Sequence, residues 1–282
     1  MAWFVAVGMP STLPVPDRTP VEVSMTAGRP KPQVDTSKPH PARIYDYLLG
    51  GKDNYPVDQA VGDRMPIEAR QGARSNRVLM QKAVAKVAHD GVDQFLDIGT
   101  GIPTEPNLHQ IVQAINPKAR VVYVDNDPIV MRHAEALLIS TPEGATDYIQ
   151  ADVREPEKIL DHARTLLDFS RPIALSLIAL MHFIPDEDDP YGIAATLLGA
   201  LPSGSCLVLT HLTTDFLSEE QNKTAEYRAS GINLRPRTRA EVERFFEGLD
   251  LGDAGLITRW YDEDPAEPGW TATGYAGIGY LP

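Results

Sequence analysis

Three acidic residues, Asp97, Asp125 and Asp152, each come at or near the end of a short apolar segment, and a glycine-containing turn follows the first of them. Gly99 and Gly101 have no Cβ, so the turn can be tight and its backbone amides can approach a ligand closely. An ionised carboxylate at the tip of the next strand can accept hydrogen bonds from both hydroxyls of a ribose. A glycine turn followed by such an acid is how an open α/β sheet holds a nucleoside. The pattern predicts a nucleoside-containing cofactor.

The elements that position these residues are apolar segments that alternate with segments of helical periodicity. Strands separated by helices indicate βαβ units, a parallel sheet and right-handed crossovers. We therefore predict an α/β fold with a doubly wound, mostly parallel, seven-stranded Rossmann-like sheet. The expected strands are 94–98, 120–124, 146–150, 172–180, 205–211, 253–261 and 271–281.

The chain divides into three regions by composition. Residues 1–38 are rich in Pro, Thr, Ser and Val without a helical or strand period, which predicts a disordered tail. Residues 39–91 predict a helical N-terminal cap, with one short helix stopped by Gly50–Gly51 and a second over 74–89. Residues 92–282 hold the expected sheet and form the predicted cofactor-binding domain.

The turn after Asp97 discriminates between cofactors. A dinucleotide site needs a third glycine, and Thr104 stands in that position. The carboxylate of Asp97 would repel a pyrophosphate but suits a ligand with an ammonium or sulfonium group. Residues 50–52 lack the leading glycine and the following Ser or Thr of a nucleotide-triphosphate loop. The pattern D-x-G-x-G with an acid at the next strand tip is similar to that of sheets that bind S-adenosylmethionine (SAM).

Longer motifs make this resemblance specific. The segments that resemble the successive motifs of class I SAM-dependent methyltransferases are Phe95-Leu-Asp-Ile-Gly-Thr-Gly101, Val121-Val-Tyr-Val-Asp125, Ile149-Gln-Ala-Asp-Val153 and Ala179-Leu-Met-His-Phe-Ile-Pro-Asp186. Segments 42–55 and 98–108 more narrowly resemble a bacterial SAM-dependent methyltransferase family first catalogued as a domain of unknown function. The resemblance covers roughly residues 36–260 and implies the methyltransferase fold, SAM as cofactor and methyl transfer, with no agreed acceptor.

The strand tips carry the expected cofactor-binding residues. These residues are Asp97, Gly99, Thr100, Gly101, Asp125, Asn126, Asp152, Val153 and Leu180. By the resemblance, Asp97 lies near the methionine moiety and Asp125 accepts the ribose hydroxyls. Asp152 accepts the adenine amino proton, and the backbone N–H of Val153 donates to the adenine ring. For each acid the alternative is a structural carboxylate that binds the N–H groups of its own turn.

Two histidines, His182 and His211, end the fourth and fifth expected strands at the edge where ligands bind. His182 is the candidate catalytic residue, as a general base that removes a proton from the methyl acceptor, because an imidazole titrates near neutral pH. It could equally form part of the pocket wall, and His211 is a second candidate lining residue. Neither histidine nor the nearby Asp186 has the H-x₃-H or C-x₂-C spacing of a metal site, so no metal is expected.

The segment 39–60 is polar and aromatic around a pair of glycines. By the resemblance it is interpreted as a lid with a glycine hinge that covers the cofactor and contributes to the acceptor pocket. The lid residues expected to meet the substrate, together with His211, are Tyr45, Tyr47, Asn54 and Tyr55. The alternative is that this helix only packs its apolar side chains against the core.

Charge and composition limit the partners. A net charge of −13 over 282 residues disfavours nucleic acid and favours a small-molecule acceptor, although protein methylation stays open. The arginines at 235–239 are interpreted as a basic loop before a capped helix. We find no apolar run of ~20 residues and no signal-peptide pattern, and Met25 is a possible alternative translation start. The single cysteine, Cys206, favours a cytoplasmic location.

The same motifs leave two other functions open. A non-catalytic SAM-binding sensor would carry the same pocket motifs as an enzyme. An NAD-dependent oxidoreductase is a third possibility, which Thr104 and Asp97 oppose. The sequence does not determine the acceptor atom or the oligomeric state.

Overall fold

The computed structural model describes residues 35–137, 139–220, 222, 224–258 and 272–282. Of the predicted disordered tail, only 35–38 belong to these residues, and they form an exposed turn. The remainder of the tail and the possible start at Met25 lie outside the described residues.

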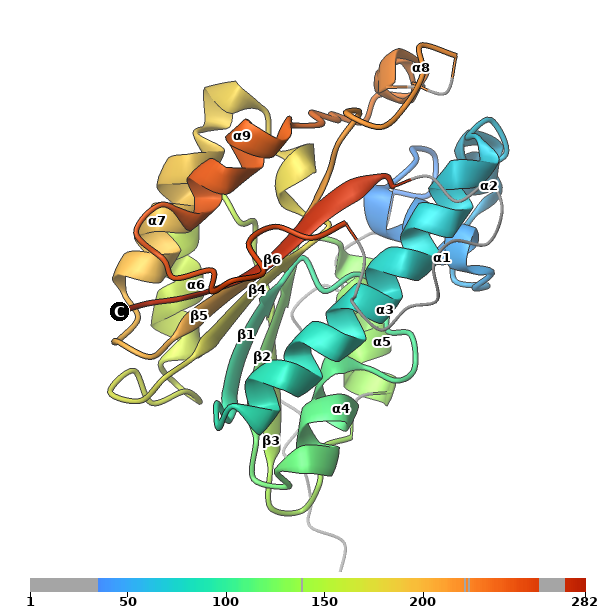
Figure 1. Cartoon of the computed structure of the whole chain (residues 1–282). Helices are drawn as coiled ribbons and strands as arrows, with labels where there is room; N and C mark the ends of the chain where they lie inside the picture. The colour runs from blue at the N-terminus through green and yellow to red at the C-terminus, as the bar shows by residue number, and fades with distance from the viewer. Residues whose placement is uncertain (1–34, 138, 221, 223, 259–271) are drawn as a thin grey trace, which may run out of the picture. The chain divides into compact units, whose positions relative to one another are not determined.

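Six strands form one sheet in the described part of the chain. They are β1 (Gln94–Ile98), β2 (Arg120–Asp125), β3 (Ala145–Gln150), β4 (Ala174–Ile178), β5 (Cys206–Leu212) and β6 (Gly274–Tyr280). Their order in the sheet is β3-β2-β1-β4-β5-β6 (Figure 1). The first five pair in parallel, and β6 is antiparallel to β5. The strand order reverses between β1 and β4, so their carboxyl ends form the point where open α/β sheets bind ligands.

The prediction of a seventh strand over 253–261 was wrong for its described residues. Residues 253–258 form turns, and only Ile257 makes an isolated antiparallel bridge, with Ala276 of β6. The physical reason is a turn at Gly255, whose φ of 57° is in the left-handed region and interrupts an extended segment. Residues 259–261 of that prediction, and residue 271 of the last predicted strand, lie outside the described residues.

Helices flank the strands along the chain. They are α1 (Pro41–Leu49), α2 (Pro56–Gly62), α3 (Ile67–His89), α4 (Leu108–Ile115), α5 (Pro128–Leu137), α6 (Pro156–Ala163), α7 (Pro190–Gly199), α8 (Thr224–Ala229) and α9 (Arg239–Glu243). Short 3₁₀ turns occur at η1 (Met181–Phe183), η2 (Asp186–Asp188) and η3 (Arg244–Phe246). Of the helices in the described ranges, none is both long and apolar enough to cross a bilayer.

The helices cover both faces of the sheet, as Figure 1 shows for α3 and α4 on one side and α6 and α7 on the other. Alternate strand residues face the two layers because the side-chain period of a strand is two. Phe95 and Val121 join the core with α3 and α4, whereas Leu96 and Val122 join the core with α6 and α7. The parallel strands are therefore buried on both faces, which explains their nearly continuous apolar sequences.

The helix α3 is longer than the 74–89 predicted from the sequence. Its first turns contain Gly72, which has low helix propensity and obscured the periodicity. A Cβ on Gly72 would lie 2.3 Å from the hydroxyl of Thr273, just before β6. The glycine therefore allows α3 to pack closely against that segment.

Candidate functional site

A cavity of about 720 Å³ lies at the carboxyl ends of the parallel strands, between these ends and residues of α1 and α3. The structure brings most of the predicted site residues into its wall. These are Tyr45, Asp97, Gly99, Thr100, Gly101, Asp125, Asn126, Asp152, Val153, Leu180, His182 and His211. Tyr47, Asn54 and Tyr55 are not among the lining residues.

The glycine turn after β1 meets the end of β4 in this wall. Gly99 has a φ of 76° and donates its N–H to the carbonyl of Val124 at 2.8 Å. A Cβ on Gly99 would lie 2.8 Å from Cδ1 of Leu180, so a larger residue here would force the Leu180 side chain to shift. The backbone before Leu180 is unusual as well, because Ala179 has a φ of 52° and donates its N–H to Oγ1 of Thr210 at 2.9 Å. Positive φ in a non-glycine residue often marks a functional site.

Asp125 ends β2 with its carboxylate buried against the glycine turn. Its Oδ2 accepts the N–H of Gly101 at 2.8 Å, and its Oδ1 accepts the N–H of Asp127 at 2.9 Å. Burial raises the pKa of Asp125, and these two backbone N–H groups oppose the shift. Each carboxylate oxygen has two lone pairs, so each retains one for a further donor. The carboxylate is held in one orientation and can still accept two hydroxyls.

Asp97 is the second buried acid, 8% exposed, near the end of β1. Burial raises the pKa of Asp97 to about 6, and the nearby guanidinium of Arg77 partly opposes this. Arg77 is fixed by hydrogen bonds that it donates to the carbonyls of Thr104 and Pro106, in the segment after the glycine turn. A cation placed beside Asp97 would stabilise the ionised form of this buried carboxyl.

Asp152 follows β3 and is already paired within the protein. Arg154 donates from Nη2 to Oδ2 at 2.7 Å and from Nε to Oδ1 at 2.9 Å. The hydrogen bonds from Arg154 lower the pKa of Asp152 to about 2, so the carboxylate stays ionised. The Arg154 guanidinium also contacts Asp188 at 3.1 Å. No sequence pattern predicts this pair, which takes up part of the hydrogen-bond acceptor capacity that Asp152 would offer an adenine.

The neutral rings of the two histidines are protonated on different nitrogens. The backbone N–H of Leu212 donates to Nδ1 of His182 at 3.3 Å, so the neutral His182 ring carries its proton on Nε2. His211 has the opposite arrangement, because its Nδ1 donates to the carbonyl of Leu212 at 2.8 Å and its Nε2 accepts from Arg237 at 3.0 Å. Burial lowers the pKa of both rings, that of His182 well below its usual value and that of His211 to about 3. This geometry disfavours the general-base role expected for His182.

Arg237 corrects the interpretation of 235–239 as a basic loop. Its side chain is completely buried and donates to the carbonyls of Met181 and Ile184 at 2.9 and 3.1 Å. It also pairs with Asp186 at 2.6 Å. The arginine therefore holds the η1 turn, which carries His182, against β5. Sequence reasoning missed it because nothing local distinguishes a buried arginine from a solvated one.

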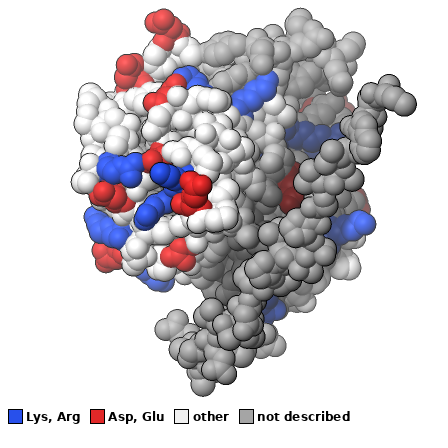
Figure 2. Space-filling view, turned by 90° about the horizontal axis from the view of Figure 1, so that it is seen from below, with Lys and Arg blue, Asp and Glu red and all other residues white. Residues whose placement is uncertain are grey.

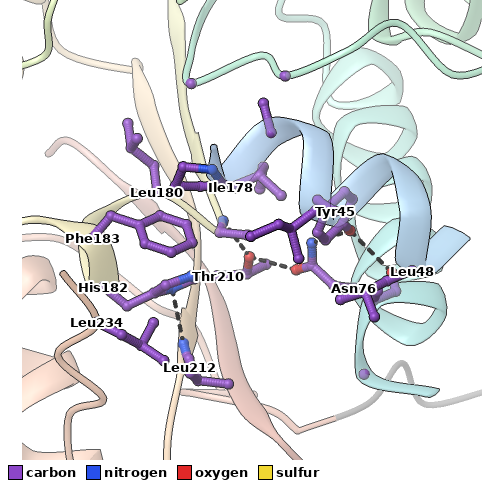
Figure 3. Close-up of a pocket in the computed structure, with 18 of the residues that line it drawn as sticks. Tyr45, Leu48, Asn76, Ile178, Leu180, His182, Phe183, Thr210, Leu212 and Leu234 are labelled. Carbon is purple, nitrogen blue, oxygen red and sulfur yellow. Dashed lines mark hydrogen bonds between the residues drawn. The ribbon is translucent and has the colours of Figure 1, made fainter. Parts of the chain in front are cut away.

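A chain of hydrogen bonds links α1, α3 and β5 across the cavity wall (Figure 3). The hydroxyl of Tyr45 donates to the carbonyl of Ala73 at 3.0 Å and accepts from Nδ2 of Asn76 at 2.8 Å. Oδ1 of Asn76 accepts from the hydroxyl of Thr210 at 2.6 Å. The network orients Tyr45 and leaves its apolar ring in the wall. Asn76 and Thr210 were not predicted from the sequence.

The remaining predicted lid residues have structural contacts outside the cavity wall. The hydroxyl of Tyr47 donates to Asp63, and Tyr55 is the N-cap of α2. Asn54 donates to Oδ2 of Asp46 at 2.7 Å, and the N–H of Asp53 donates to the same oxygen at 2.9 Å.

These bonds close the glycine turn after α1 around the Asp46 carboxylate. Gly50 has a φ of 86° and caps the helix, and a Cβ on Gly51 would overlap Oδ1 of Asp46 at 1.9 Å. The two glycines therefore serve a tight, hydrogen-bonded turn, which speaks against a hinge at this point.

Residues 27–282 match the S-adenosyl methyltransferase family. The chain belongs to this family. The predicted enzyme class, cofactor and Rossmann-like fold are thereby confirmed, and the chain is a SAM-dependent methyltransferase whose acceptor is unknown. No curated protein matches the methyltransferase.

Solved structures agree with the family. The methyltransferase is 46% identical to a DUF574 family protein from Streptomyces avermitilis MA-4680, with a TM-score of 0.85 over 89% of this chain and 100% of that one. It is 38% identical to a candidate methyltransferase from Thermobifida fusca YX, with a TM-score of 0.79 over 88% and 96% of the two chains. A SAM-dependent methyltransferase from Anabaena variabilis ATCC 29413 shares the fold alone, at 14% identity and a TM-score of 0.53 over 90% and 98%.

The donor set at the strand tips fits SAM. Asp125 presents two fixed acceptor oxygens with a free lone pair each, as two vicinal hydroxyls require. Asp97 supplies negative charge for an ammonium or sulfonium. Open space surrounds the position of an added Cβ on Gly101, so a ligand can approach the turn directly. Among the described residues, no group of three or more His, Cys, Asp or Glu is placed to hold a metal ion.

Proposed function

We propose that this methyltransferase transfers a methyl group to a small, largely apolar molecule that enters the same cavity as the cofactor. The observation that carries this proposal is the continuity of the cavity from the acidic strand tips to an apolar part. The apolar part is lined by Leu48, Met65, Phe183, Leu212, Tyr227 and Leu234. Figure 3 shows several of these side chains around His182.

The contacts at the strand tips support one assignment of roles. In this assignment Asp97 would lie beside the methionine end of the cofactor and Asp125 would hold the ribose. Asp152 and the Val153 N–H would meet the adenine. SAM supplies a methyl group on a positive sulfur, which an acceptor lone pair takes up while the bonding electrons return to sulfur as a neutral thioether. The protein's contribution is alignment and exclusion of water, which can provide roughly 7–11 kcal/mol.

Residues 39–91 act as the helical cap of the site, and 92–282 as the SAM-binding domain. The hydrogen bonds from Tyr45 to Asn76 and from Thr210 to Asn76 support this division, since they join α1 and α3 to the end of β5. The cap limits access of water to the cavity and contributes the Tyr45 ring to the acceptor side.

A small-molecule acceptor agrees with the charge of the protein better than a nucleic acid or membrane partner. Figure 2 shows positive and negative side chains intermingled over the described residues of one face. The net charge of −13 acts in the same direction. We place the protein in the cytoplasm on the basis of its one cysteine, Cys206, which is buried and unpaired.

Incubation of the full chain with SAM labelled in its methyl group and a fractionated cell extract tests the proposal. We expect label in the extractable small-molecule fraction, and less of it with the Asp125→Ala variant at a SAM concentration that does not saturate the unaltered protein. Label found only in protein or nucleic acid would overturn the small-molecule acceptor. Binding of SAM without transfer to any fraction would overturn the proposed turnover.

A further inference from the structure

The imidazole of His182 lies in the apolar part of the cavity with one nitrogen engaged by the protein. Nδ1 accepts the backbone N–H of Leu212 at 3.3 Å (Figure 3). The Phe183 ring lies 4.4 Å from the imidazole centroid to centroid, and Leu180 and Leu234 also line this part of the wall. For Nε2, no protein partner is found among the described residues.

A backbone N–H can only donate, so the bond to Nδ1 fixes the tautomer. The neutral ring must carry its proton on Nε2. A base needs a free lone pair, and the remaining ring nitrogen already has a proton. In this state His182 can donate a hydrogen bond into the cavity and cannot take a proton from the acceptor.

The surroundings keep the ring neutral. The titratable and charged groups that face His182 are His211 of β5 and the buried Arg237, and burial together with both groups lowers the pKa of His182 well below its usual value. His211 is itself neutral, because its Nε2 accepts from Arg237 and its Nδ1 donates to the Leu212 carbonyl. A second proton on His182 would place a cation beside the arginine.

We propose that His182 selects the acceptor by donating its Nε2–H to an oxygen of that molecule. The acceptor is then a largely apolar molecule that carries an oxygen able to accept this hydrogen bond, such as a carbonyl oxygen. An N–H left unpaired in an apolar wall is unfavourable, so a molecule that offers oxygen there binds better than its hydrocarbon counterpart. This inference rests on the proposed function, since it concerns the acceptor side of the same cavity.

The proton position is measured directly on the full chain labelled with ¹⁵N-histidine. Two-bond ¹H–¹⁵N spectra should show an unprotonated Nδ1 and a protonated Nε2 for His182 from about pH 6 to 8. The His182→Gln variant identifies the signals by their loss. A proton on Nδ1, or a charged ring in this range, would overturn the inference.

The preference for oxygen is tested with acetophenone and α-methylstyrene, which differ only by a carbonyl oxygen in place of a methylene. With S-adenosylhomocysteine present, we expect the protein to bind the ketone about 5-fold more tightly than the hydrocarbon. His182→Phe should abolish the preference, whereas His182→Gln, which keeps an N–H donor, should retain most of it. Thermal unfolding confirms that both variants are folded.

The outcomes separate this inference from the proposed function. Failure of the unaltered protein to bind S-adenosylhomocysteine would count against the proposed cofactor site. Three results with S-adenosylhomocysteine bound would overturn the role of His182 alone. The protein could bind the two probes with equal affinity, could bind neither saturably, or could keep its preference for the ketone in His182→Phe.

Discussion

Arg43 of α1 and Asp127, two residues beyond the end of β2, form a buried ion pair. Nε of Arg43 lies 3.6 Å from Oδ2 of Asp127, and its Nη1 lies 3.7 Å from Oδ2 of Asp58. All three side chains are at most 4% exposed. Asp127 also donates its N–H to Asp125, the acid proposed to hold the ribose. The first helix and the cofactor-side strand tip are therefore held by one cluster of charges.

Substitution of Arg43 by Met should destabilise the protein strongly. The change leaves Asp58 and Asp127 buried without their shared cation, and loss of one partner from a buried ion pair costs about 3–5 kcal/mol. Chemical denaturation measures the free energy of unfolding. As a matched control, Arg164→Met removes an exposed arginine that pairs with Asp161 and should cost no more than about 1 kcal/mol. Equal losses for the two variants would contradict the role assigned to the buried cluster.

Asp125→Asn should weaken SAM binding while the overall fold is retained. The amide nitrogen cannot accept a hydrogen bond, so one of the N–H groups of Gly101 and Asp127, and one ribose hydroxyl, lose their acceptor. We expect a loss on the order of 1–3 kcal/mol, measured by titration calorimetry. Asp161→Ala, which changes an exposed acid on α6, serves as the control and should leave the affinity unchanged. The same affinity for Asp125→Asn and the unaltered protein would place the ribose elsewhere.

The strand-tip part of the site could be predicted from the sequence because its residues belong to motifs that are contiguous in the chain. The predicted strands at 94–98, 120–124 and 146–150 agree with β1, β2 and β3 within one residue at each end. A strand, its turn and the acid at the next strand tip are contiguous motifs, and burial on both faces of a parallel sheet makes them apolar. The positions of Asp97 and Asp125 at neighbouring strand ends can therefore be predicted from the sequence alone.

The acceptor side was not accessible, since it is assembled from segments far apart in the chain. Asn76 and Thr210 meet only through the packing of α3 on β5, and Arg237 reaches the η1 turn from a later loop. Buried polar partners of this kind have no periodicity or spacing of their own. His182 was found as a strand-end histidine, but its tautomer depends on the backbone N–H of Leu212, which no sequence pattern reveals.

SAM affinity should rise with pH between about 5 and 7. Burial raises the pKa of Asp97 to about 6, so the carboxyl is protonated and neutral below this pH and ionised above it. The ionised form alone attracts the positive groups of SAM, and its fraction increases about tenfold over this interval. Fluorescence or calorimetric titrations at several pH values measure the change.

Asp97→Asn is the matched variant for this pH dependence. Asn has the same shape as Asp and does not titrate, so the increase in SAM affinity with pH that arises from Asp97 should disappear. Asp125, whose pKa burial also raises, leaves a slope of the same sign. A pH profile of Asp97→Asn that coincides with that of the unaltered protein would show that the dependence arises elsewhere.

Gly99→Ala should destabilise the protein more than Gly91→Ala. Both glycines have positive φ, 76° and 100°, so both substitutions carry the left-handed strain of roughly 1–2 kcal/mol. The new Cβ at Gly91 meets nothing within 4 Å, whereas that at Gly99 lies 2.8 Å from Leu180. The difference between the two free energies of unfolding therefore isolates the close approach of the glycine turn after β1 to the end of β4.

In the Gly99→Ala background, Leu180→Ala should lower the free energy of unfolding less than it does alone, because it also relieves the overlap between the two side chains. Additive effects of the two substitutions would show that the contact does not restrict residue 99.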